Sequence, residues 1–215
     1  VSKLNPKHLN GAILINIDAE DEGVFFASCA GGARNLLNFE ATRQNEKHPV
    51  YTLTVEGLKG GHSGMEIDKG RANAIHLLGR VLDALEGEVS FNLHSLLGGE
   101  KMNAIPKFAH ADISFEAGER SKVEATLLSM ETAFKEEYEA TDNAIALALS
   151  KTSHASHSFD KVSKERLISI LRLMPTGINT LSHDIEGLVE SSNNLGVMTT
   201  KATTVTLESA IRSSK

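Results

Sequence analysis

An acidic run from Asp18 to Gly23, with the sequence Asp-Ala-Glu-Asp-Glu-Gly, holds the first residues that could do chemistry. Carboxylate oxygens are accepted zinc ligands, although a run of charge is more often a solvated turn. Asp18 differs from its neighbours because the apolar residues 12–17 directly precede it and are a candidate buried strand. Metals and ligands commonly bind at the carboxyl ends of such strands. Asp18 is therefore the candidate metal ligand of the run.

A glycine-rich segment, residues 57–64 (Gly-Leu-Lys-Gly-Gly-His-Ser-Gly), presents His62 at its centre. Closely spaced glycines let a backbone turn with positive φ or approach a ligand. His62 on such a platform is a candidate site residue, since functional side chains are often carried on loops. The alternative is a flexible strand-to-helix connection that holds an incidental histidine.

Two further polar residues could contact a substrate. Asn103, in the turn-like segment 98–106, could donate and accept hydrogen bonds to a peptide. Its alternative role is turn formation, which asparagine and glycine both favour. Arg212 follows the Ser/Asn-rich segment 190–196 and lies near the end of a predicted strand. A guanidinium there can hold a carboxylate through two parallel hydrogen bonds, and an ordinary surface arginine is the alternative.

The elements that must position these residues follow from hydrophobic periodicity. Alternating apolar residues predict strands around 51–55, 89–93, 109–115 and 145–149. Apolar residues at helical spacing predict helices over 75–85 and 123–134. Ser121 and Glu124 match a capping box that would start the second helix. The order strand, helix, strand, strand, helix, strand predicts an α+β fold, a ferredoxin-like antiparallel sheet with its helices on one face.

The remaining third of the chain partly repeats this order. Residues 156–163 are polar and predict a loop, and a helix is predicted to follow over 167–174, ended by Pro175. Strand patterns then cover residues 187–200 and 203–213. Helix, strand, strand matches the middle of the first unit. The sequence therefore predicts a partial second αββ unit without its last helix and strand.

Composition narrows the class of protein. The formal net charge of -6 and the lack of a Lys/Arg cluster argue against nucleic acid and anionic membrane surfaces as partners. No stretch approaches the about 18–20 apolar residues of a membrane-spanning helix. The single cysteine cannot form an internal disulfide, which favours a reducing, cytoplasmic location. The start at Val1 without Met favours a segment of a longer protein.

Residues 13–23 with 28–32, 57–74, 98–106 and 187–214 together resemble the Xaa-His (aminoacyl-histidine) dipeptidases, also called peptidase D. These enzymes are a branch of the zinc aminoacylase and carboxypeptidase superfamily. The resemblance implies a catalytic domain with two zinc ions and a lid domain inserted into it. It assigns residues 1–23 to the edge of the catalytic domain, 24–150 to the first αβ unit of the lid, and 151–215 to its incomplete second unit.

The resemblance also implies roles for the candidate residues. Asp18 matches a zinc ligand, and His62 matches the lid histidine that steadies the scissile carbonyl oxygen as negative charge develops. Asn103 and Arg212 match lid residues that contact the dipeptide, near its carboxylate. The other zinc ligands and the general-base glutamate are not in this sequence. We therefore expect an inactive lid fragment that forms a homodimer, the alternative being a stand-alone dimerisation or ligand-binding module.

Overall fold

The computed structural model describes the chain except for residues 1–4, 6, 8–9, 14–21, 24–28 and 153–156. The chain divides into two compact units, Val1–Ala30 and Gly31–Lys215. Asp18 and most of the strand predicted before it lie outside the described residues. All elements discussed below belong to the second unit. Among the described helices, none combines the length and the hydropathy that a membrane crossing requires.

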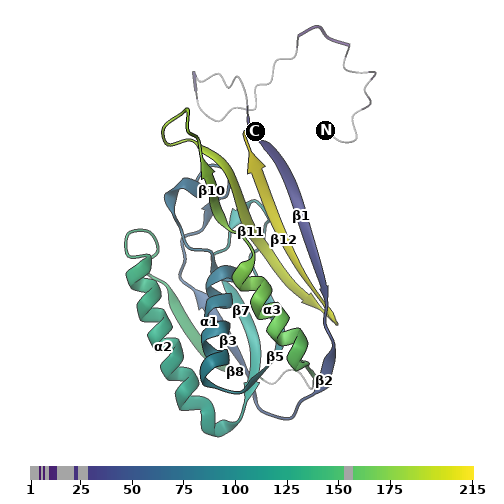
Figure 1. The fold of residues 1–215 in the computed structure, drawn as a ribbon, viewed down its shortest axis with the longest axis vertical. Coiled ribbons are helices and arrows are strands. Elements are labelled where there is room, and N and C mark those ends of the chain that lie inside the picture. The colour runs from purple at the N-terminus through teal and green to yellow at the C-terminus, as the bar shows by residue number, and fades with distance from the viewer. Residues whose placement is uncertain (1–4, 6, 8–9, 14–21, 24–28, 153–156) are drawn as a thin grey trace. The chain divides into compact units, whose positions relative to one another are not determined.

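The middle of the chain forms the predicted ferredoxin-like unit. Its elements in chain order are β3 (Val50–Glu56), α1 (Ala74–Glu88), β5 (Phe91–Gly98), β7 (Ala109–Phe115), α2 (Arg120–Glu137) and β8 (Ala146–Thr152). The strands lie side by side in the order β5-β7-β3-β8, and each neighbouring pair is antiparallel. Helices α1 and α2 lie on the same face of this sheet (Figure 1). The predicted α+β fold class is therefore confirmed.

The partial second unit extends the same sheet beyond β5. It contains α3 (Lys161–Leu173), β10 (Gly177–Leu181), β11 (Val189–Lys201) and β12 (Thr204–Ser213). β11 follows β5 in the sheet, β12 follows β11, and β10 pairs with β11. The outermost place is taken by β1 (Gly31–Glu40), which pairs with β12 along its whole length. The sequence patterns did not predict β1, because nearly all of its side chains are exposed and carry no alternation of apolar residues.

Two short pairs complete the strands: β2 (Arg43–Asn45) with β9 (His157–Phe159), and β4 (Gly61–His62) with β6 (Ala104–Ile105). The pair β4–β6 matters for function because it joins the glycine-rich segment to the Asn103 segment. Neither pair could be predicted from periodicity, since strands of two or three residues are too short to show it.

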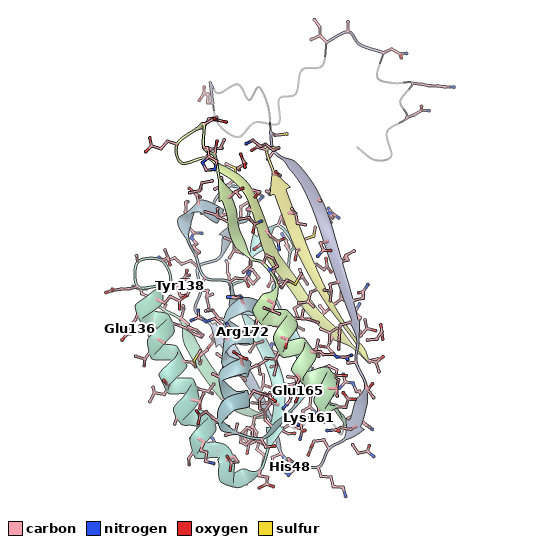
Figure 2. All side chains as sticks on the ribbon, in the orientation of Figure 1. His48, Glu136, Tyr138, Lys161, Glu165 and Arg172 are labelled. Atoms are coloured by element: carbon pink, nitrogen blue, oxygen red, sulfur yellow. The ribbon has the colours of Figure 1, made fainter. Side chains whose placement is uncertain are left out.

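Helix α1 lies at the centre of the hydrophobic core. Its N-terminus is capped by Asn73, whose side-chain oxygen accepts hydrogen bonds from the backbone N–H groups of Ile75 (3.0 Å) and His76 (3.2 Å). One face of α1 is fully buried against the sheet, and α3 packs beside it. Arg172 on α3 extends toward α1 (Figure 2) and pairs with Asp83 at 3.1 Å. The helix layer therefore covers both the ferredoxin-like unit and the partial second αββ unit.

The ferredoxin-like unit and the partial second αββ unit meet where β5 lies beside β11. Backbone pairing between these strands comprises one residue pair, Met198 with Gly98, and side chains strengthen the junction. Thr200 Oγ1 accepts a hydrogen bond from Leu96 N and donates one to Leu96 O, both at 2.9 Å. Thr200 thus replaces a backbone partner with a hydroxyl group, which can donate and accept at once.

Two local predictions were wrong. Ser121 and Glu124 do not form a capping box: α2 begins at Arg120, directly after the 3-10 turn Ala117–Glu119, so Ser121 is already inside the helix. Glu124 pairs instead with Arg120 at 2.8 Å. The polar stretch predicted as a loop over 156–163 is not a loop in its described part, which begins at His157. It holds β9 and the first turn of α3, and Asp160 caps that helix by accepting from Ser163 N at 2.7 Å. Helix-capping residues are polar, which made this stretch resemble a loop.

Candidate functional site

His62 ends β4 and is exposed. Its ring nitrogen Nδ1 lies 3.2 Å from the backbone N–H groups of both Gly64 and Met65. A backbone N–H can only donate, so Nδ1 must accept. In the neutral imidazole the proton is then on Nε2, and the free side of the ring is a hydrogen-bond donor. The loop therefore prepares His62 to donate to an oxygen atom of a ligand.

The glycines of segment 57–64 are explained by close approaches of other groups. A Cβ atom on Gly61, where φ is +147°, would lie 2.5 Å from Glu66 Oε2. A Cβ atom on Gly64 would lie 2.7 Å from Cζ of Arg212. The Arg212 guanidinium thus packs directly on the backbone of the His62 loop. The loop of His62 and the side chain of Arg212, far apart in the sequence, are brought together by this contact.

Glu66 holds the backbone of His62, and the sequence patterns did not predict this role. Its Oε2 accepts a hydrogen bond from His62 N at 2.9 Å, and its Oε1 pairs with Arg71 and Lys69, both at 3.0 Å. The His62 N–H and then the Lys69 side chain are the main causes that lower the pKa of Glu66 to about 2. Glu66 is therefore a carboxylate across the physiological pH range. Its role could not be read from the sequence, because its principal partner is a backbone amide.

Asn103 lies beside His62. Its carbonyl oxygen accepts a hydrogen bond from Ser63 N at 2.9 Å, directly after the β4–β6 pair. Its own side chain is exposed. The segment is held by Asn194, whose Nδ2 donates to Met102 O (2.9 Å) and Ala104 O (2.8 Å). The Ser/Asn-rich strand sequence was the signal that could have pointed to Asn194, because an amide side chain buried in a strand needs hydrogen-bond partners.

Arg212, on β12, lines a groove of about 600 Å³ together with Asn103. The groove also contains Arg34, Lys101 and Glu208. Within the described part of the chain, Arg212 forms no ion pair, and its Nε is buried without a hydrogen-bond partner. Such an atom is normally satisfied by a ligand or a water molecule. The groove is thus lined by a half-buried guanidinium that has no carboxylate partner among the described residues.

A second hollow, of about 700 Å³, lies where the end of α1, the start of β5, the end of β7 and the start of α3 meet, and it is rich in charge. Its buried Lys164 donates to Phe91 O at 3.0 Å and pairs with Glu86 at 2.9 Å. The chemistry of that lysine is therefore already satisfied within the protein. The smaller groove, with its unpaired arginine beside an oriented histidine, is the stronger candidate site.

A metal centre does not fit the described residues, in which no group of three or more His, Cys, Asp or Glu side chains is placed to hold an ion. Zinc in proteins is usually held by about four donors. The Nδ1 atom of His62 is not available to a metal ion, because it accepts hydrogen bonds from two backbone N–H groups. The predicted ligand Asp18 lies outside the described residues.

The sheet, the helix layer and the groove define an α+β domain in which polar side chains line a groove beside the His62 loop. Residues 53–142 match the family described as the peptidase dimerisation domain, of the M20 type. This match runs from β3 to the turn after α2, which is most of the ferredoxin-like unit. Residues 53–142 are therefore similar to an M20-type peptidase dimerisation domain.

Two known proteins are similar over nearly the whole chain. The cytosol non-specific dipeptidase of Escherichia coli (strain K12) is 33% identical over 207 residues, which is 95% of this chain and 43% of that protein. The crystal structure of the aminoacylhistidine dipeptidase of Vibrio alginolyticus superposes with a TM-score of 0.87 at 34% identity, over 95% of this chain and 42% of that one. These matches confirm the resemblance found in the sequence. The chain spans less than half the length of both relatives.

Proposed function

We propose that this chain is the lid and dimerisation part of a cytoplasmic, zinc-dependent dipeptidase that cleaves Xaa-His dipeptides. The proposal has two supports. One is the similarity to two dipeptidases, of which the chain covers 43% and 42%. The other is the groove in which an unpaired Arg212 lies against the loop of an oriented His62.

Arg212 and Asn103 of the groove, and His62 on the loop packed against Arg212, each receive a role from their chemistry. Arg212 binds the terminal carboxylate of the dipeptide, since a guanidinium can form two charge-assisted hydrogen bonds with it. His62 donates its Nε2–H to the scissile carbonyl oxygen, which gains negative charge in the transition state. Asn103, exposed at the groove wall, offers its amide to the peptide backbone. The proposal keeps Asp18 as a zinc ligand and assigns all further ligands to residues outside this sequence.

The test uses the longer dipeptidase that this proposal requires. His62→Ala should lower kcat about 10²–10³-fold, the usual effect of losing one oxyanion donor. Arg212→Ala should raise KM for a free dipeptide and abolish the enzyme's preference for that dipeptide over its C-terminal amide. Arg172→Ala, which removes a pair with Asp83 outside the groove, is the matched control and should change neither. An Arg212→Ala enzyme that still prefers the free carboxylate would show that the groove is not the carboxylate site.

A further inference from the structure

Asp142 is a buried carboxylate for which the roles assigned above have no use. It is 1% exposed and lies in the turn between α2 and β8. The turn itself is closed by a hydrogen bond from Asp142 N to the carbonyl of Tyr138 (2.8 Å), the residue labelled at the end of α2 in Figure 2. Burying a carboxylate is costly unless its oxygen atoms are hydrogen-bonded, so the partners of Asp142 indicate what it does.

Both carboxylate oxygens of Asp142 accept backbone hydrogen bonds from the His62 loop. Oδ1 accepts from Lys59 N at 2.7 Å, and Oδ2 accepts from Ala72 N at 2.9 Å. These two amides stand at the two ends of segment 59–72, and His62 lies inside it. One side chain thus fixes both ends of the loop from a distant part of the chain, 83 and 70 residues away.

The base of the loop is also in close contact with the Asp142 turn. Gly57 has a φ of +82°, and a Cβ atom there would lie 2.0 Å from the carbonyl oxygen of Ala144. Only glycine therefore allows this approach. The loop is therefore in close contact with the turn. The Asp142 carboxylate connects the two through its hydrogen bonds to Lys59 N and Ala72 N, and we call this arrangement the clip.

A short series of contacts connects this clip to the backbone of His62. Arg71, next to Ala72, donates to Gly60 O and pairs with Glu66 at 3.0 Å. Glu66 in turn accepts from His62 N at 2.9 Å. If either end of the segment were released, Arg71 and Glu66 would lose their fixed positions, and with them the backbone of His62.

We propose that Asp142 is the positioning residue of the His62 loop: it holds both ends of segment 59–72 so that His62 keeps its Nε2–H directed toward a bound peptide. The functional part of this statement rests on the role proposed above for His62. The structural part, the orientation and tautomer of the ring, is independent of that role and can be measured on the 215-residue chain.

The decisive variant is Asp142→Asn. An asparagine side chain has one accepting oxygen and one donating NH₂ group, so it can accept from only one of the two amides and meets the other with a second donor. The matched control is Asp112→Asn. Asp112 accepts from two hydroxyl groups, Thr52 Oγ1 at 2.7 Å and Ser95 Oγ at 2.8 Å, and a hydroxyl can reverse its direction to accept from the new NH₂ group.

The first measurement is the ¹⁵N chemical shifts of the His62 ring in the full 215-residue chain. Wild type and Asp112→Asn should show the Nε2–H tautomer alone. Asp142→Asn should show a mixture of both neutral tautomers while the amide signals of β3, β7 and β8 remain dispersed. Unchanged His62 ring signals in a folded Asp142→Asn chain would overturn the proposal.

A second measurement needs no variant and so remains informative if Asp142→Asn does not fold. Lys59 has an exposed side chain, yet its amide should be protected from hydrogen exchange, as should that of Ala72. Rapid exchange of either amide would show that the clip is not formed in solution, and would also overturn the proposal.

Kinetics in the longer dipeptidase then separate the two levels of the inference. Asp142→Asn should lower kcat about 10–100-fold, as small displacements of a catalytic group do, with KM nearly unchanged and no additional loss in a His62→Ala background. If Asp142→Asn alters the ring tautomer but His62→Ala leaves turnover unchanged, the role proposed for His62 is wrong and the positioning of the loop stands. If His62→Ala lowers turnover but Asp142→Asn changes neither ring signals nor kcat, the positioning role is wrong.

Discussion

His62 and Arg212 are brought into contact through a glycine rather than through a bond between their side chains. Gly64 lies under the guanidinium, and its missing Cβ leaves the space that the Arg212 side chain occupies. The conformation of Gly64 is not left-handed, so an alanine is acceptable to the backbone there. Its effect should therefore fall on Arg212 and not on the loop.

We expect Gly64→Ala to displace the guanidinium, because the new methyl group would lie 2.7 Å from Cζ and 2.9 Å from Nε. In the longer dipeptidase KM should rise about tenfold, which corresponds to about 1.4 kcal/mol of lost binding. The thermal midpoint should barely change. Gly118→Ala is the control, since no atom lies within 4 Å of its Cβ position. Equal kinetics for both variants would contradict the contact.

Glu66 gives a prediction about acid. Its pKa is lowered from 4.5 in the reference state to about 2, chiefly by the His62 N–H and Lys69. As pH falls, the unfolded chain takes up this proton first, so the contribution of Glu66 to stability is complete above about pH 4.5 and is lost toward pH 2. The difference in unfolding free energy between wild type and Glu66→Gln should therefore shrink between these pH values. Urea titrations at several pH values would reveal it, and parallel curves would contradict it.

At the scale of elements, α1 and α3 approach closely at Gly79. A Cβ atom on Gly79 would lie 2.7 Å from Cβ of Leu171 on α3, whereas Gly87 on the same helix has open space. The two glycines therefore test helix propensity and helix packing separately within α1.

We expect opposite results at these two positions. Gly87→Ala should stabilise the chain by up to about 1 kcal/mol through helix propensity. Gly79→Ala has the same gain but forces α1 and α3 apart, and overpacking typically costs about 1–3 kcal/mol. Its net effect should be a loss of about 1 kcal/mol. Denaturant unfolding of both variants decides this, and stabilisation by Gly79→Ala would show that the helices separate without cost.

The elements differ in how far the sequence predicted them. β3 and β7 were predicted because each buries one face, so their apolar residues alternate. β1 was not, because a mostly exposed edge strand has no such pattern. At the candidate site, His62, Asn103 and Arg212 were selected by residue type, and their proposed roles came from the family resemblance. Asp142 and Glu66 were not, because their partners are backbone amides that only the folded chain brings near.

At the scale of the whole molecule, the described residues contain groove side chains but no metal ligand group. We expect the 215-residue chain to hydrolyse no Xaa-His dipeptide, even with excess zinc or manganese. The expected reason is that the general base and most metal ligands of the family resemblance lie outside this sequence. Metal-dependent turnover by the purified chain, removed by a chelator, would contradict the prediction.

The match of residues 53–142 to a peptidase dimerisation domain leads us to expect self-association. Leu36 on β1 is 61% exposed, and β1 is an edge strand of the sheet that the described residues form. An edge strand with apolar side chains invites pairing with a second copy. Sedimentation should show a dimer at high micromolar concentration, and Leu36→Lys should shift it toward monomer. Leu128→Lys, at a 68% exposed position on α2, is the control. If the Leu128 variant dissociates and the Leu36 variant does not, the interface lies on the helix layer.

The pairing of β1 with β12 has a consequence for synthesis on the ribosome. Asn38 and Thr206, whose side chains bond across this pair at 2.8 Å, are 168 residues apart. At about 5–20 residues per second, β1 waits roughly 10–30 s for its partner strand to be made. The ferredoxin-like unit can fold during that interval, while β1 remains without a partner and exposed to chaperones and proteases. Arg212 arrives with β12, so a nascent chain completes the candidate groove only after that strand is made.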